Sequence, residues 1–158
     1  MASLNQLIDD YLAGPALVRQ AVKGMNSEQL RARPIPGMWS TLEVVCHLVD
    51  FDPIYADRMK RVIAEDNPVL VGADEKRFAA ALAYHERDLD EELSILEHTR
   101  RQFARILRAL PPDVLQRRGQ HSERGPVTLE QLLTTIIGHI PHHARFIHDK
   151  RKALGLGA

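Results

Sequence analysis

The sequence lacks the residues that mark secreted, membrane or nucleic-acid-binding proteins. Its single cysteine, Cys46, excludes an internal disulfide and suits a reducing compartment. Its 21 lysines and arginines are balanced by 21 aspartates and glutamates, so no overall basic field attracts nucleic acid or an anionic membrane. Residues 1–25 contain Asp9 and Asp10 and no uninterrupted apolar run, unlike a secretory signal or a membrane span. We therefore expect a cytoplasmic protein without nucleic-acid or membrane partners.

Common catalytic motifs are also missing. The sequence contains no glycine-rich phosphate loop and no serine-centred elbow. Cys46 directly precedes His47, so on a helix their side chains point about 100° apart and do not form a nucleophile and base pair. Covalent catalysis is therefore not supported.

Hydrophobic periodicity predicts the fold class. Four segments carry apolar residues at helical spacing, and proline- and glycine-containing stretches separate them. No alternating pattern is long enough to indicate a sheet. The length of 158 residues is typical of one domain. We predict that residues 1–158 form a single all-α domain, an antiparallel four-helix bundle.

Capping residues and prolines indicate where the long helices begin and end. Pro53 lies inside the second helix and predicts a bend there, whereas Pro111 and Pro112 end the third helix. Between the second and third helices we expect a loop at 66–72 and a short helical patch around Phe78 and Leu82. A loop at 119–125 should connect the third helix to the fourth. The predicted N-caps of the four long helices are Ser3, Ser40, Asp88 and Thr128.

A histidine cluster lies inside the otherwise apolar last segment. His139 and His143 are spaced i, i+4, about 40° apart around a helix, so both imidazoles can converge on one divalent metal ion. No glutamate follows His139, which excludes the zinc-protease motif. His142 could instead chelate with His139 as an i, i+3 pair, and this alternative stays open. We rank His143 first because it lies nearer the apolar face that meets the bundle interior.

His47 is the candidate third ligand, because it lies among apolar residues on the face of the second helix that should point inward. A lone histidine in such surroundings is more often a hydrogen-bonded core residue, but the pair on the last helix favours a ligand role. Glu43 and Asp50 flank it at i−4 and i+3 and are weak candidates for orienting its ring.

Three neutral imidazoles would leave open positions on a metal ion, the arrangement of a catalytic rather than a structural centre. The nitrogen ligand set suits zinc, nickel, iron or copper and does not choose among them; we expect zinc or nickel first, with iron or copper as alternatives. Several other basic and histidine side chains are expected to be exposed to solvent, on helix faces or in loops. They are Arg58, Arg100, Arg101, Lys150, His85, His98, His121 and His148.

Several motifs together resemble the DinB/YfiT-like superfamily of metalloenzymes. They are Pro36-Gly37-Met38-Trp39-Ser40, Glu43, His47-Leu48, Val127-Thr128-Leu129, and Gly138-His139 through His142-His143. The resemblance covers nearly the whole chain. It implies a four-helix bundle holding one divalent metal ion through His47, His139 and His143.

The resemblance also implies a function and partners. Some members of this superfamily are thiol-dependent transferases or isomerases that use low-molecular-weight thiols, and many form homodimers. We therefore expect a metal-dependent transferase or hydrolase acting on a small molecule, with a low-molecular-weight thiol as a candidate partner. The alternative is a non-catalytic metal-binding stress-response protein. The sequence contains no separate general base that narrows the reaction.

Overall fold

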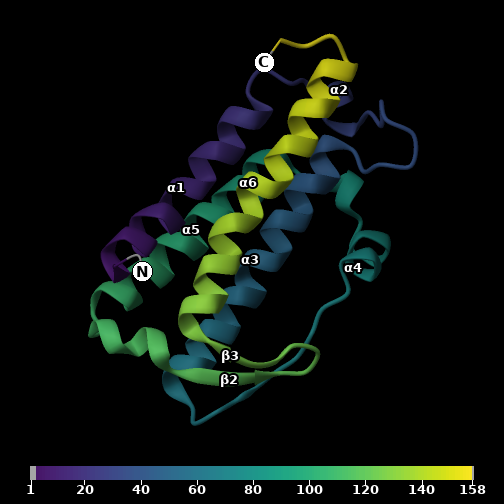
Figure 1. The fold of residues 1–158 in the computed structure, drawn as a ribbon. Helices are drawn as coiled ribbons and strands as arrows, with labels where there is room; N and C mark the ends of the chain where they lie inside the picture. The colour runs from purple at the N-terminus through teal and green to yellow at the C-terminus, as the bar shows by residue number, and fades with distance from the viewer. Residues whose placement is uncertain (1–2, 158) are drawn as a thin grey trace.

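The computed structural model describes residues 3–157 and contains the predicted four-helix bundle. Its long helices are α1 (Leu4–Val22), α3 (Thr41–Ala64), α5 (Leu89–Arg108) and α6 (Leu129–Ala153) (Figure 1). Among the described residues, no helix is long and apolar enough to cross a membrane.

The four predicted N-caps are confirmed. Ser3, Ser40, Asp88 and Thr128 each accept a hydrogen bond from the first turn of their helix, which satisfies an amide that the helix leaves free. Pro53 lies inside α3 and does not end it, since the helix continues to Ala64. Pro15 and Pro141 likewise lie inside α1 and α6, and both helices continue through them.

The order of the helices was not predictable from their periodicity. α1 and α3 each pack against both α5 and α6, so α1 and α3 lie diagonally across the bundle. In Figure 1, α1 and α6 run upward while α3 and α5 run downward. Two of the four adjoining pairs are therefore antiparallel, and the pairs α1/α6 and α3/α5 are parallel.

A parallel α3/α5 pair requires a long connection that returns along the outside of the bundle. Residues 65–88 make this crossover, visible on the right of Figure 1, and include β1 (Val69–Leu70), α4 (Glu75–Ala81) and the 3-10 turn η1 (Tyr84–Glu86). The helical patch predicted around Phe78 is therefore confirmed as α4. The shorter α1–α3 connection holds the unpredicted helix α2 (Ser27–Arg31).

The two expected loops contain a small sheet instead. β1 pairs in parallel with β2 (Arg118–His121), which pairs antiparallel with β3 (Gly125–Thr128). The 3-10 turn η2 (Pro112–Gln116) leads into this hairpin from α5. The expectation of no sheet was wrong because strands of two to four residues are too short to show an alternating pattern.

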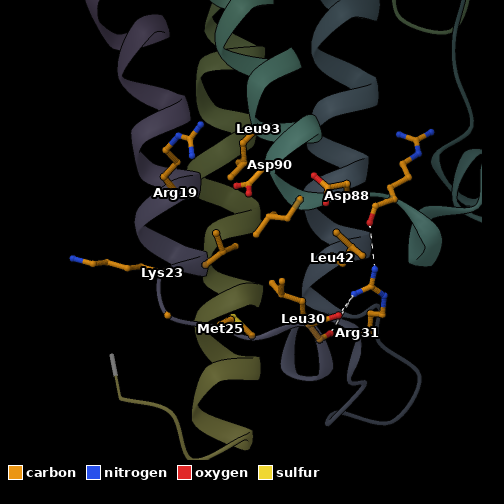
Figure 2. A pocket seen from close by; sticks show the side chains of 14 residues that line it. Arg19, Lys23, Met25, Leu30, Arg31, Leu42, Asp88, Asp90 and Leu93 are labelled. Carbon is orange, nitrogen blue, oxygen red and sulfur yellow. Dashed lines mark hydrogen bonds between the residues drawn. The ribbon is translucent and has the colours of Figure 1, made fainter.

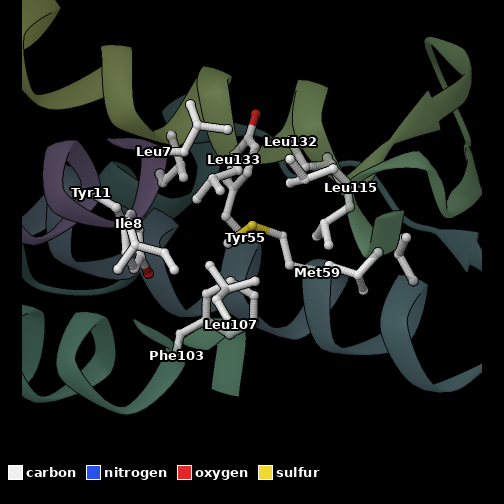
Figure 3. Packing of buried hydrophobic residues seen from close by; sticks show 14 of the residues in the cluster. Leu7, Ile8, Tyr11, Tyr55, Met59, Phe103, Leu107, Leu115, Leu132 and Leu133 are labelled. Carbon is white, nitrogen blue, oxygen red and sulfur yellow. The ribbon is translucent and has the colours of Figure 1, made fainter. Parts of the chain in front are cut away.

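Two apolar clusters fill the bundle, one toward the sheet end and one toward α2. The first joins residues of all four long helices, and Figure 3 shows Tyr11, Met59, Phe103 and Leu133 among the side chains that fill the space between them. These side chains are almost fully buried, which places the main hydrophobic stabilisation between the helices rather than within them.

A buried ion pair crosses the core near these clusters. Arg100 is fully buried and donates to both carboxylate oxygens of Asp52 and to the carbonyls of Tyr11 and Ile136. A Cβ at Gly14 would meet the Arg100 Nη1 atom at 2.2 Å, so the close approach of α1 depends on glycine there. The expectation that Arg100 is solvated was wrong, because its charge is fully compensated inside the bundle.

Candidate metal centre

Three histidines from two helices converge beside the bundle axis. The His47 Nε2 atom on α3 lies 3.0 Å from His139 Nε2 and 3.2 Å from His143 Nε2 on α6. The candidate ligand atoms of all three lie within 4.8 Å of one another. His142 lies outside this cluster, and its Nδ1 lies 3.0 Å from the Arg145 side chain. The geometry therefore selects His143 over His142 as the candidate partner of His139.

The donor set fits a divalent ion. Two nitrogens bound about 2.1 Å from one ion, at angles of about 90–110°, are separated by roughly 3.0–3.4 Å, as His47 is from both His139 and His143. All three Nδ1 atoms are buried without a hydrogen-bond partner among the described residues. Three Nε2 lone pairs directed at one point would repel one another without a cation between them, so the arrangement suits a metal ion.

Burial keeps these rings in the neutral form that binds metals. Desolvation lowers the pKa of His47 to about 4, and desolvation followed by the neighbouring histidines lowers the pKa of His139 to about 3. The same causes lower the pKa of His143 to about 4. Near neutral pH no proton competes with an ion at these nitrogens.

Aromatic packing, rather than a carboxylate, orients His47. Its ring lies 4.6 Å from the Phe51 ring and 5.3 Å from the Trp39 ring, between centroids. Glu43 pairs with Arg33 and the Ser40 amide, and Asp50 pairs with Arg87, so neither orients the imidazole. The expectation of carboxylate support was wrong because closer partners occupy both acids.

Sequence reasoning missed one acid beside the histidines, Glu75. Its Oε2 atom lies 3.8 Å from His47 Nε2, and half of its side chain is exposed. Glu75 is the first residue of α4, which Asp74 caps by accepting two backbone hydrogen bonds. Only the crossover brings α4 over the cluster, so no local signal in the sequence could reveal this contact.

The histidines open into a cavity of about 340 Å³, within the range of small-molecule sites. His121 and Arg58 line this cavity and are both buried, at 5% and 6% exposure. They were expected to be exposed, but β2 carries His121 inward and the crossover covers Arg58. The aromatic rings of Phe51 and Tyr55 complete its apolar wall.

A second, mostly apolar cavity of about 360 Å³ adjoins the cluster on the other side of Glu75 and shares His143. Trp39, Phe146 and Lys150 line it. Lys150 is 1% exposed and donates to the Phe146 carbonyl, and burial lowers its pKa. The expectation of a solvated Lys150 was therefore wrong as well.

A third cavity lies between α1, α2, α3 and α5, away from the histidines (Figure 2). It is the largest of the three, at about 460 Å³, and is rich in charged side chains. Arg31 and Arg87 in its wall already contact backbone carbonyls or carboxylates, and Arg19 pairs with Glu97. Its cations are thus mostly satisfied, and it holds no cluster of metal-binding residues among positions 3–157.

Comparison with known proteins gives consistent matches across the chain. The family model described as the DinB superfamily matches residues 11–147. An Oceanobacillus iheyensis protein named "Putative metal-dependent hydrolase" is 30% identical over 151 residues, covering 94% of this chain and 87% of that protein. YfiT of Bacillus subtilis, which carries the same description, is 28% identical over 142 residues, covering 89% of this chain and 80% of its own.

The structural comparison agrees with these matches. The solved structure of Bacillus subtilis YfiT, described as a probable metal-dependent hydrolase with an unusual four-helix bundle topology, superposes with a TM-score of 0.89. It is 26% identical, and the match covers 98% of this chain and 89% of that one. The parallel and antiparallel pairing described above is thus shared with a solved bundle.

Proposed function

The chain belongs to the DinB superfamily, and we propose that it is a metal-dependent hydrolase of a small molecule whose ion is held by His47, His139 and His143. An all-imidazole ligand set suits zinc, nickel, iron or copper, and of these we propose zinc or nickel. The names of its relatives support hydrolysis. Transfer to a low-molecular-weight thiol would use the same centre.

One observation carries this proposal: the three Nε2 atoms converge where a cavity opens. A structural metal site is usually closed by four protein ligands, whereas this cluster offers three and borders about 340 Å³ of space. That space admits water and a small substrate. The arrangement favours catalysis over a non-catalytic metal-binding role.

Each protein group near the cluster has a distinct part. A bound divalent ion would supply a Lewis acid that lowers the pKa of water or a thiol. The Glu75 carboxylate can accept the proton released by that nucleophile, because its Oε2 atom lies 3.8 Å from a ligand nitrogen. Phe51 and Tyr55 exclude bulk water from one side of the cavity.

The ligand assignment is tested by elemental analysis of untagged protein purified without added metal. We expect near-stoichiometric metal in the wild type and none in a folded His47→Gln, His139→Gln, His143→Gln variant. His142→Ala is the matched control, because it removes a neighbouring histidine outside the cluster and should retain the metal. Equal metal in the wild type and the triple variant, or none in the wild type after reconstitution, would reject the assignment.

The catalytic proposal is tested with a panel of chromogenic esters, amides and thiol conjugates. Glu75→Gln should retain the metal but lower kcat by roughly 100-fold, the usual contribution of a general base. Glu86→Gln is the control, because Glu86 is also exposed on the crossover but does not line the cavity. Metal-loaded protein that turns over no compound of the panel would favour the non-catalytic alternative.

A further inference from the structure

Arg58 is a buried cation that lacks a carboxylate partner among the described residues, although its guanidinium lies over the Tyr55 ring at 5.1 Å from the centroid. It lies on α3, is 6% exposed, and lines the cavity that contains the three histidines. Its Nη2 atom donates to the Val71 carbonyl at 2.6 Å, but its Nε atom is buried and has no acceptor. No carboxylate among residues 3–157 lies within 4.0 Å of its guanidinium nitrogens. Burial of an unpaired charge is costly, so a partner from outside the chain is expected here.

Two further hydrogen-bond donors face the same cavity from the small sheet. Arg124, in the turn between β2 and β3, is exposed and forms no ion pair with the described residues. The His121 Nδ1 atom accepts a hydrogen bond from the Glu123 amide, so the neutral ring carries its proton on Nε2. Burial and then the charges of Arg58 and Arg124 lower the pKa of His121, which shows how close these groups lie.

The carboxylates of the cavity are directed elsewhere. The Glu75 carboxylate lies beside His47, and the Glu123 carboxylate lies against Gly72, where an added Cβ would meet its Oε1 atom at 2.7 Å. Neither acid pairs with Arg58 or Arg124 within 4.0 Å. The guanidinium groups therefore remain available to a bound anion.

We propose that Arg58 and Arg124, with His121 as a further donor, bind the oxyanion group of an anionic substrate beside the metal centre. Guanidinium groups bind carboxylates and phosphates through paired charged hydrogen bonds. Phe51 and Tyr55 in the same cavity would contact the apolar part of such a molecule. The substrate class is thus a small carboxylate or phosphate with an apolar or aromatic body.

This inference rests on the proposed metal-dependent function for the reaction itself, but anion binding can be measured separately. The structure places the anion site between the sheet and α3, and the histidine nitrogens between α3 and α6. The oxyanion would anchor one end of the substrate while the bond to be cleaved lies at the histidines. Binding energy from that remote anchor would position the reacting atoms.

The test is calorimetric titration of metal-loaded and chelator-treated protein with benzoate, phenyl phosphate and the neutral analogue benzamide at constant ionic strength. Arg124→Gln should weaken binding of the preferred anion roughly tenfold, the usual loss for one charged hydrogen-bond partner. Arg58→Gln should have an effect of at least that size, and benzamide binding should not change. Comparison of benzoate with phenyl phosphate shows which oxyanion the site prefers.

Arg118→Gln is the matched control. Arg118 is an exposed arginine on β2, six positions before Arg124, and does not line the cavity. Equal anion binding by wild type, Arg118→Gln and Arg124→Gln would overturn the inference, as would equal loss in both variants. So would wild-type protein that binds neither anion more tightly than benzamide. If Arg58→Gln fails to fold, Arg124→Gln decides alone, because its side chain is exposed.

The two proposals fail in different ways. Chelator-treated protein that binds benzoate through Arg124, combined with no metal binding after reconstitution, would reject the metal function and retain the anion site. Metal-loaded protein whose anion binding does not respond to either arginine would retain the metal centre and reject the anion site.

Discussion

Two regions of this bundle bury arginines, and they treat the charge in opposite ways. In the core, Arg100 is surrounded by the Asp52 carboxylate and two carbonyls. In the histidine cavity, Arg58 has one carbonyl partner and a buried Nε without an acceptor. The core supplies an acceptor for each nitrogen of the Arg100 guanidinium, whereas the cavity leaves the buried Arg58 Nε without one.

This difference separates a structural polar group from one prepared for a ligand. A buried ion pair with complete hydrogen bonding holds the helices in one arrangement but binds nothing further. An unpartnered buried charge costs stability, and a bound ligand that completes its hydrogen bonds is one physical reason for such a group to persist. Measurements that remove one group at a time can therefore assign each region to its role.

The largest expected effect is at the core ion pair. Arg100→Met leaves Asp52 buried without its partner and should lower the free energy of unfolding by about 3–5 kcal/mol. Urea denaturation followed by circular dichroism measures this loss, with the exposed neighbour Arg101→Met as control. The double variant Arg100→Met, Asp52→Leu should recover much of it. A single variant within 1 kcal/mol of wild type would show that the pair is not structural.

Acid should act on the histidine region next. The three histidines have pKa values lowered from 6.5 to about 4 or 3, so the unfolded chain binds their protons first as the pH falls. The stability that the three neutral histidines contribute is present above pH 6.5, and it is lost as the pH falls toward 4. For metal-free protein the loss between pH 6.5 and 5.5 should total about 3 kcal/mol.

The triple variant with glutamine at positions 47, 139 and 143 lacks these groups and serves as the reference for this acid effect. Its urea midpoint should change much less across the same pH range. Parallel pH profiles for the wild type and the triple variant would contradict the assignment of acid sensitivity to the three histidines.

Metal binding at the three histidines should raise the free energy of unfolding by about as much as the acid effect lowers it. At a free zinc concentration roughly 100-fold above Kd, the free energy of unfolding should rise by about 2.7 kcal/mol. Thermal denaturation with and without a chelator measures the change. His139→Ala should abolish it and His142→Ala should not. An equal response in both variants would mean that zinc binds elsewhere.

The smallest effects are expected at the proposed anion site. Arg58→Gln loses one hydrogen bond to Val71 but also removes an unpaired buried charge, so stability should fall by about 1 kcal/mol or less. Arg124→Gln should change it by less than about 0.5 kcal/mol. A loss at Arg58 as large as that at Arg100 would remove the contrast between the two regions.

Local signals predicted much of the fold and none of its long-range order. Ser40 with Glu43 and Thr128 with Gln131 form capping boxes in both sequence and structure, because a cap depends only on residues within one turn. The parallel pairing of α3 with α5 depends on tertiary packing between distant segments. The short strands at 69–70 and 118–121 pair across distant parts of the chain and left no periodic pattern.

The site residues also differ in whether local sequence signals could identify them. The pair His139 and His143 was found because both lie on one helix, and His47 because its face is apolar. Their role as metal ligands stays a prediction until metal is measured. Glu75, Arg58 and His121 were missed or placed at the surface because the crossover and the sheet bury or position them. Charged residues on helix faces are usually solvated, and here tertiary structure overrides that tendency.

The separation of the histidines along the chain has a consequence for folding kinetics. His47 and His139 are 92 positions apart, so the cluster exists only after α6 has docked on α3. Closing so long a loop is entropically costly and slow relative to helix formation. The rate of metal uptake during refolding should therefore report the docking of α6, whereas circular dichroism reports the earlier growth of the helices.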